Sequence, residues 1–370
     1  MSHELFPVRA GRSGVGHPAS AWSMLLLATT FLLACTPARP AVTGAGSDLA
    51  PPPAPEKVRL GALNSASDAG LWIALAKKYF EQEGIEPEIT NFASAAEMVA
   101  PLGAGQIDVG GGAPGVGLAA AVLRGIEIKV VADKATTSPG HGYQAIVVRK
   151  DLSDSGQITS AADLKGRKVA LPSTTGITPE VMLNHAMQRA GLTARDTDLV
   201  SMAFPDMVGA FANKAIDAGV VIEPFLTRVV EGGEGVVLER ADVAYPNQQV
   251  AVILYSGDFA RKQDLATRFM AAYLRGVRDY NDAFTKQDAA RRAEVIEILA
   301  EYTTIKDRAL YEKVVMPGLD PNGKVNVDSL KADQEYYLAA KLQERPADMD
   351  RIVDMTFAEA AVRRLGQYTP

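Results

Sequence analysis

Hydroxyl, amide and carboxylate side chains gather in short loops, and these loops precede segments with helical periodicity. The free N–H groups at a helix start, together with such side chains, suit a small polar solute held by hydrogen bonds. The histidines of the predicted mature chain, His141 and His185, show neither Ser/His/Asp spacing nor metal-ligand spacing, so hydrogen bonding is the chemistry that the loops offer. The candidate ligand-binding residues are Asn64, Ser65, Ser67, Asp68, Trp72, Ser94, Gly112, Ala113, Pro114, His141, Ser173, Thr174, Thr175, Asp206 and Glu223.

The charges near these loops limit which solute they suit. Lys134 is the one cation close to them, so a bare multivalent anion such as phosphate is disfavoured. The carboxylates of Asp68, Asp206 and Glu223 would repel an anion unless a ligand amine or ring N–H meets one of them. Glu223, at the end of an apolar run and before a proline, is the best candidate for that contact. The sequence therefore favours an aminosulfonate or a pyrimidine precursor over nitrate or a simple alkanesulfonate.

Several of these residues also have a purely structural interpretation. Asp68 and Asp206 could cap helices or accept backbone N–H groups, and the run 173–175 could be a simple helix cap. Trp72 falls in the first turn of a helix predicted from about residue 69 to 83, where a tryptophan more often packs in the core than contacts a ligand. His141, in a Gly- and Ser-containing loop, is open to either role, whereas His185 lies in the middle of a predicted helix and is assigned a structural one.

The loops are positioned by two segments in which the same sequence features follow in the same order. In 105–114 a Gly turn leads into Ile107–Val109, a predicted buried strand, then three glycines and a helix. In 213–224 another Ile-Asp pair leads into an apolar strand, a loop with a proline and a further helix. Ligands of open α/β sheets bind at loops that follow the strands, so the sequence predicts two α/β lobes that face each other across a cleft.

Alternating strands and helices, with the first strands predicted at 58–62 and 86–91, extend this pattern over most of the chain and predict mostly parallel sheets. Two runs rich in β-branched residues, 143–149 and 250–255, are the predicted crossovers between the lobes. The predicted division is lobe 1 over 56–147 and 254–370, and lobe 2 over 148–253. At 370 residues the chain exceeds what one core usually holds, which agrees with two lobes.

Composition excludes several classes of protein. A net charge of −6, without a basic run or a stripe of aromatic residues, argues against nucleic acid as a partner. The single cysteine rules out an intramolecular disulfide framework and a cysteine-rich metal site. No cofactor and no metal are predicted.

The N-terminus has the features of an export signal. Arg9 and Arg12 precede an apolar run, 24–33, which is shorter than the roughly 20 residues that span a bilayer. The run ends at Leu32-Leu33-Ala34-Cys35, which resembles a bacterial lipobox with a lipid-modified cysteine. The alternative is a plain secretory signal with an incidental cysteine. Residues 1–34 are the predicted signal peptide, and 35–55, rich in Pro, Ala and Gly, are the lipidated Cys35 and a tether.

The order and spacing of several short motifs resemble the nitrate/sulfonate/taurine and thiamine-precursor family of ABC-transporter substrate-binding proteins. The motifs are 105–110 (Gly-Gln-Ile-Asp-Val-Gly), Arg124-Gly125, 163–170, 216–218, Glu223-Pro224 and the tail 353–361. This resemblance implies a type II periplasmic-binding-protein fold, with two α/β lobes that close on a small solute. It also implies an extracytoplasmic, membrane-anchored monomer with ABC permease and ATPase subunits as partners.

Two other functions fit the same fold. An enzyme acting on a small heterocycle or organic acid is one, although the chain lacks the cysteine cluster of the eukaryotic pyrimidine synthases of this fold. An accessory protein of a two-component sensor is the other, and it would use the same cleft. The prediction is a solute-binding protein that is not an enzyme.

Overall fold

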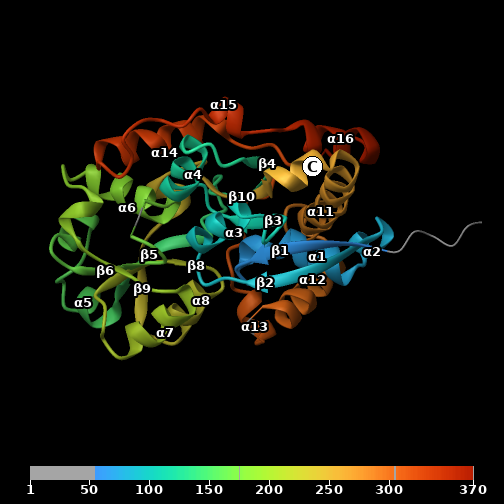
Figure 1. Ribbon diagram of the computed structural model, residues 1–370. Coiled ribbons are helices and arrows are strands. Elements are labelled where there is room, and N and C mark those ends of the chain that lie inside the picture. The colour runs from blue at the N-terminus through green and yellow to red at the C-terminus, as the bar shows by residue number, and fades with distance from the viewer. Residues whose placement is uncertain (1–54, 175, 304–305, 370) are drawn as a thin grey trace, which may run out of the picture. The chain divides into compact units, whose positions relative to one another are not determined.

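The described strands form two sheets of five strands each (Figure 1). The computed structural model describes residues 55–174, 176–303 and 306–369. The predicted signal peptide, Cys35 and all but the last residue of the tether lie outside these ranges, as does Thr175. No helix within them is long and apolar enough to cross a membrane. Residues 53–370 form one compact unit.

The two sheets have the same strand order, β2-β1-β3-β10-β4 in the first and β7-β6-β8-β5-β9 in the second. In each, the fourth strand (β10 or β5) is antiparallel to both neighbours, and the other described pairings are parallel. The strands are β1 (Glu56–Ala62), β2 (Ile85–Asn91), β3 (Val109–Gly112), β4 (Ile128–Thr136), β5 (Gln144–Arg149), β6 (Lys168–Leu171), β7 (Asp198–Ser201), β8 (Ala218–Ile222), β9 (Gly235–Arg240) and β10 (Gln249–Ser256).

The runs that the sequence suggested as crossovers are both strands, and each belongs to one sheet. The predicted lobe boundaries, after residue 147 and after residue 253, fall inside β5 and inside β10. The chain passes between the sheets in the segment between β4 and β5 and again between β9 and β10. The division into lobes at those boundaries stays a prediction.

Helices pack on both faces of each sheet. Successive side chains of a strand point to opposite faces, and in the buried strands both sets are apolar, so both faces need a cover. The longer helices are α1 (Ala69–Ala76), α4 (Val116–Leu123), α6 (Thr178–Gln188), α7 (Phe204–Ala212), α8 (Phe225–Glu231), α11 (Gln263–Phe284), α12 (Ala289–Tyr302), α14 (Val327–Ala339) and α16 (Thr356–Leu365). The shorter ones are α2 (Tyr79–Gln82), α3 (Val99–Gly103), α5 (Lys150–Asp154), α9 (Ala241–Ala244), α10 (Gly257–Arg261), α13 (Arg308–Tyr311) and α15 (Met349–Ile352), and the 3₁₀ turns η1 (Ala66–Asp68), η2 (Ala95–Met98), η3 (Ala161–Leu164) and η4 (Ala194–Asp196).

The three glycines at 110–112 lie within a strand, which corrects the predicted loop. They form most of β3, where Gly110 is opposite both Gly61 and Leu254. A Cβ on Gly111 would lie 2.7 Å from Cε of Lys134. The glycines therefore let neighbouring side chains approach the strand, and the strand ends one residue before Ala113.

The repeated Ile-Asp pair ties strands together. The Asp108 carboxylate accepts the backbone N–H of Arg59 on β1 at 2.9 Å. In the second sheet the Asp217 carboxylate accepts the backbone N–H of Lys168 on β6 at 3.1 Å. Both aspartates precede the third strand of their sheet, so the repeated motif is explained by sheet assembly.

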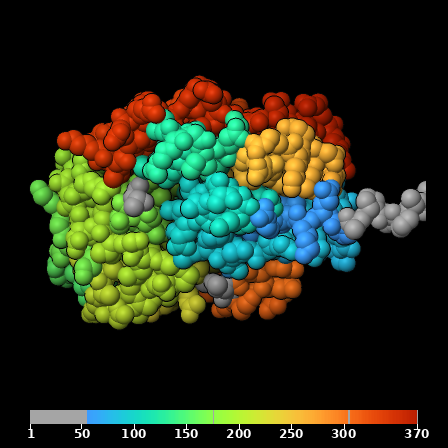
Figure 2. All heavy atoms as spheres, viewed as in Figure 1, coloured from blue at the N-terminus to red at the C-terminus, as the bar shows by residue number. Residues whose placement is uncertain are grey.

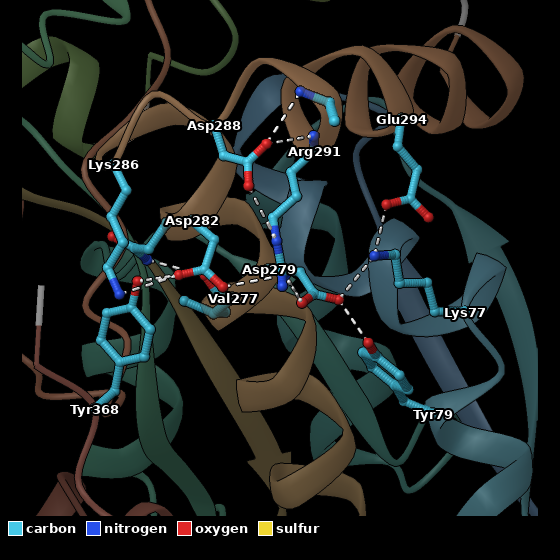
Figure 3. A network of polar contacts seen from close by, with 12 residues as sticks. Lys77, Tyr79, Val277, Asp279, Asp282, Lys286, Asp288, Arg291, Glu294 and Tyr368 are labelled. Atoms are coloured by element: carbon cyan, nitrogen blue, oxygen red, sulfur yellow. Dashed lines mark hydrogen bonds and ion pairs between the residues drawn. The ribbon is translucent and has the colours of Figure 1, made fainter.

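A network of charged side chains joins the residues after α1 to α11, α12 and the C-terminal segment (Figure 3). Asp279 on α11 lies at its centre, 3.1 Å from Nζ of Lys77 and 2.9 Å from Nη1 of Arg291. It also accepts the Tyr79 hydroxyl at 2.5 Å. Because much of the network is exposed, each pair contributes on the order of 1 kcal/mol or less to stability.

Replacement of Gly276 by alanine is expected to destabilise the protein, because α1 and α11 cross closely there. A Cβ on Gly276 would lie 2.2 Å from the carbonyl oxygen of Gly70, and backbone cannot move aside as a side chain can. We expect a loss of about 1–3 kcal/mol in the free energy of unfolding, measured in urea. The matched control is Gly209→Ala on α7, where a Cβ would meet nothing within 4 Å. That variant should gain about 0.5–1 kcal/mol from helix propensity, and equal effects of the two changes would contradict the packing argument.

The C-terminal segment, residues 327–369, runs along one edge of the described part of the chain (Figure 2). Its helix α14 contacts both α6 and β10. On α14 the buried Asp333 carboxylate accepts Nε2 of Gln248 at 3.3 Å. Burial raises the pKa of Asp333 to about 8.

This aspartate should make stability fall with pH. Its folded-state pKa lies above the unfolded value of about 3.9, so between about pH 4 and 8 the folded protein holds a proton that the unfolded chain has lost. The free energy of unfolding should decrease across that window and level off above it. Asp333→Asn should reduce the decrease, measured in urea at pH 5 to 8; the remainder belongs in part to Asp133, whose pKa burial raises to about 7. Asp328→Asn, on an exposed position of the same helix, is the control and should keep the wild-type slope.

Candidate ligand cleft

A small cavity lies where the carboxyl ends of parallel strands from both sheets meet. Leu63 follows β1, Ala113 follows β3 and Pro172 follows β6, and all three line it. Residues at the start of the antiparallel strands, the first residue of β5 (Gln144) and the second of β10 (Val250), complete the same ring. Its volume is about 40 Å³, much less than the roughly 300–1,000 Å³ of a typical ligand site. A solute of more than a few atoms therefore requires the walls to separate.

The wall of the cavity is mostly apolar and, among the described residues, carries no charged side chain. The lining residues are Leu63, Ser67, Ala95, Ala96, Ala113, Tyr143, Gln144, Pro172, Ile177, Thr178, Pro179, Phe204, Ile222, Val250 and Ala251. Burial raises the pKa of the Tyr143 phenol, so this side chain is neutral at physiological pH. Apart from Tyr143, the polar side chains on the wall are Ser67, Gln144 and Thr178.

Two of these three side chains already have protein partners. The Thr178 hydroxyl donates to the carbonyl of Val250 at 3.0 Å. The Ser67 hydroxyl lies 2.9 Å from Oγ of Ser65 and accepts Nζ of Lys134 at 2.8 Å. Gln144 differs: it is fully buried, and within the described residues neither Oε1 nor Nε2 has a hydrogen-bond partner.

A buried ion pair stands behind Ser67. Nζ of Lys134, on β4, lies 2.7 Å from Oδ1 of Asp68, and both side chains have 0% of their surface exposed. The other oxygen of Asp68 accepts the backbone N–H of Leu63 at 3.1 Å and of Ser65 at 2.9 Å. The charge of Lys134, the cation that the sequence placed near the site, is therefore balanced within the protein by Asp68. Asp68 has the structural role that the sequence analysis left open.

Backbone groups bridge the two halves of the cleft. The N–H of Val116, at the start of α4, donates to the carbonyl of Gly176 at 2.9 Å. The N–H of Ala66 donates to the carbonyl of Glu223 at 3.2 Å. Each bond joins a loop of the first sheet to a loop of the second, so the cleft in this structure is closed.

The Glu223 carboxylate is bound by groups of the protein itself and is not free for a ligand amine. Its buried carboxylate accepts the backbone N–H groups of Thr227 at 2.9 Å and Val315 at 3.4 Å, and Arg240 lies 3.8 Å away. Burial raises the pKa of this carboxyl. Glu223 does not line the cavity, so the predicted contact with an amine loses its geometric basis.

Trp72 and His141 lie away from the cavity wall. Trp72 is 2% exposed and stacks on Tyr302, with ring centroids 5.7 Å apart, so it belongs to the core. Nδ1 of His141 lies 3.1 Å from the carbonyl of Met316, and the ring borders a separate surface depression lined also by Asn247 and Asp320. Neither residue is positioned to contact a solute between the sheets in this structure.

The other predicted residues surround the cavity without lining it. Ser94 precedes the lining pair at 95–96, Ser173 and Thr174 follow Pro172, and the exposed Asp206 lies in the first turn of α7 after Phe204. Gly112 and Pro114 flank Ala113, and Asn64 and Ser65 lie between Leu63 and Ser67. Of the fourteen predicted positions that the structure describes, which exclude Thr175, only Ser67 and Ala113 lie on the wall.

Sequence reasoning missed the residues supplied by the antiparallel strands. It placed the site in loops that follow strands, whereas Gln144 and Val250 are the first and second residues of strands that run the opposite way. One signal was present. Gln144 is a polar residue that directly precedes the apolar run 145–148.

A family model described as NMT1/THI5 like matches residues 65–290. A protein of Brucella abortus (strain 2308) named as a binding protein is 26% identical over 245 residues, which are 63% of this chain and 66%, just under two thirds, of that relative. The alkanesulfonate-binding protein SsuA of Xanthomonas axonopodis pv. citri, solved with MOPS bound, superposes with a TM-score of 0.67 at 19% identity, over 81% of this chain and 99% of that one.

The periplasmic nitrate-binding protein NrtA of Synechocystis PCC 6803 superposes with a TM-score of 0.69 at 16% identity, over 85% of this chain and 90% of that one. At these identities the superpositions establish the fold, which is that of the periplasmic binding proteins. The matched family model extends over more than half of the residues. This chain therefore belongs to the NMT1/THI5-like family.

Proposed function

We propose that this protein is the extracytoplasmic solute-binding component of an ABC importer and that it captures a small polar organic solute by closure of two lobes. The observation that carries the proposal is the cavity at the carboxyl ends of strands from two sheets of identical order. A solute that contacts both halves of such a site stabilises the closed form, and its affinity depends on those contacts. A sulfonate and a pyrimidine precursor are the first ligand classes to test.

The partners and the location belong to the same proposal. An importer requires a permease and an ATPase, and Cys35 would hold the protein at the membrane through attached lipid. Anchoring by more than one acyl chain is stable because each buried CH₂ contributes about 0.8 kcal/mol. In cells, Cys35→Ser should move the protein from the membrane fraction to the soluble fraction or block its processing. An unmodified thiol on Cys35 of the mature wild-type protein would contradict the anchor.

A thermal-shift panel tests solute binding. The mature chain with Cys35→Ser is melted with methanesulfonate, taurine, nitrate and 4-aminopyrimidine, and each shift is checked by calorimetry. A ligand at 100 times its Kd should stabilise the protein by about 2.7 kcal/mol. One site per chain and recovery of the solute unchanged, by mass spectrometry, support a binding protein. Conversion of a bound solute to another compound would favour the enzyme of the same fold instead.

A further inference from the structure

The amide of Gln144 lies on the cavity wall, and the described residues provide no hydrogen-bond partner for it. Its two polar atoms have no hydrogen bond within the described residues, and the side chain is fully buried. A buried amide without partners costs free energy, so it persists where it serves another purpose. The amide cannot turn to solvent, because Gln144 is held on β5 opposite Ile222, which also lines the cavity.

The surroundings of Gln144 offer nothing that would neutralise an anion. Among the described residues the wall has no charged side chain, and Lys134 is already paired with Asp68 behind Ser67. A buried anion without a cation is unfavourable, and the acceptor oxygen of an amide beside it adds to the cost. A buried glutamine satisfies both of its atoms only with a partner that offers an acceptor next to a donor.

We propose that the Gln144 amide forms hydrogen bonds to the ligand and selects it. The ligand group that faces Gln144 is uncharged and has a hydrogen-bond donor next to an acceptor. Carboxamides, lactams and primary sulfonamides belong to this class; sulfonates, carboxylates and nitrate do not. The inference rests on the proposed function, and it narrows the solute to an uncharged one that is apolar elsewhere. Ala95, Pro172 and Phe204 provide the apolar contacts for the rest of the molecule.

The test uses matched pairs that differ in charge at one group: methanesulfonamide and methanesulfonate, benzamide and benzoate, and taurine as a zwitterion with an anionic end. A cell metabolite extract, separated on an anion exchanger at pH 7 into retained and unretained fractions, supplies solutes outside the panel. Binding is measured by thermal shift and calorimetry on the wild type, Gln144→Leu and Gln157→Leu. Gln157 is exposed and serves as the matched control.

We expect the uncharged members, or the unretained fraction, to bind the wild type and the Gln157→Leu control equally. Gln144→Leu should weaken that binding at least tenfold and should melt no lower than the wild type without ligand, because it removes an amide that lacks partners. Binding of an anionic member or of the retained fraction, or equal binding by Gln144→Leu, overturns the inference and leaves the proposed function standing. If no fraction and no panel member binds the wild type, the proposed function fails and the inference fails with it.

Discussion

Replacement of Lys134 by methionine is expected to lower the free energy of unfolding by about 3–5 kcal/mol, one of the two largest effects we predict. The change removes the only cation that the structure places on Asp68, 2.7 Å away, and both side chains are inaccessible to solvent. Asp68 would then be a buried charge that accepts only neutral donors among the described residues, namely two backbone N–H groups and the Ser65 hydroxyl at 3.5 Å. Urea denaturation at pH 7, followed by circular dichroism, measures the loss.

A second substitution separates the charge from the packing. In the Lys134→Met background, Asp68→Asn removes the uncompensated charge and keeps an oxygen to accept the N–H groups of Leu63 and Ser65. This double variant should recover most of the loss, because replacing a buried pair by uncharged groups costs far less than breaking it. A loss below about 1 kcal/mol in the single variant, or no recovery in the double, would show that the pair does not carry this stability.

Gly176→Ala should reduce ligand affinity by about 5- to 150-fold, which corresponds to about 1–3 kcal/mol against the closed cleft. Gly176 has φ +83, and a Cβ there would lie 2.5 Å from Cγ2 of Val116 across the cleft. The contact with Val116 is made where the two halves meet, so it raises the free energy of the closed form; the Cβ would also lie close to Leu342, at 3.2 Å, and Tyr337, at 3.3 Å. A ligand that binds the closed form loses affinity by the same factor.

Two matched variants isolate the cross-cleft contact. Gly166→Ala has the same backbone strain, with φ +70, but its Cβ would meet nothing within 4 Å. It should cost stability and leave affinity unchanged, measured by calorimetry with the solute that binds in the panel. Val116→Ala added to Gly176→Ala removes the clashing methyl group and should restore most of the affinity. Equal losses of affinity in both glycine variants would mean that strain, and not closure, is responsible.

The repeated architecture could be read from the sequence because it follows from local patterns. Strands were expected near 58–62, 86–91 and 250–255, and the structure has β1, β2 and β10 there. The apolar run of 250–255 fits a fully buried strand, and the Gly and Pro residues between the strands mark turns. The predicted helix 69–83 was only partly right. It is broken at Lys78, whose φ of +58 separates α1 from α2 and is not apparent from hydrophobic periodicity.

The cavity wall could not be read in the same way, because its residues come together from distant parts of the chain. Ser67 and Lys134 lie 67 residues apart and are joined by a bond of 2.8 Å. Gln144 enters the site because β5 runs antiparallel to its neighbours, which depends on the path between the two sheets. Glu223 looked available in sequence, but its carboxylate is used by backbone N–H groups, one of them 92 residues away.

The sequence by itself determined the alternation of strands and helices, the repeated unit around 105–114 and 213–224, and the loops that border the cleft. These depend on hydrophobic periodicity and turn residues, which act over a few neighbouring positions. Only the tertiary structure decided which polar groups face the cavity and which are consumed inside the protein. That choice depends on partners brought close by the fold: Asp68 pairs with Lys134, whereas the Gln144 amide has no hydrogen-bond partner in the described part of the chain.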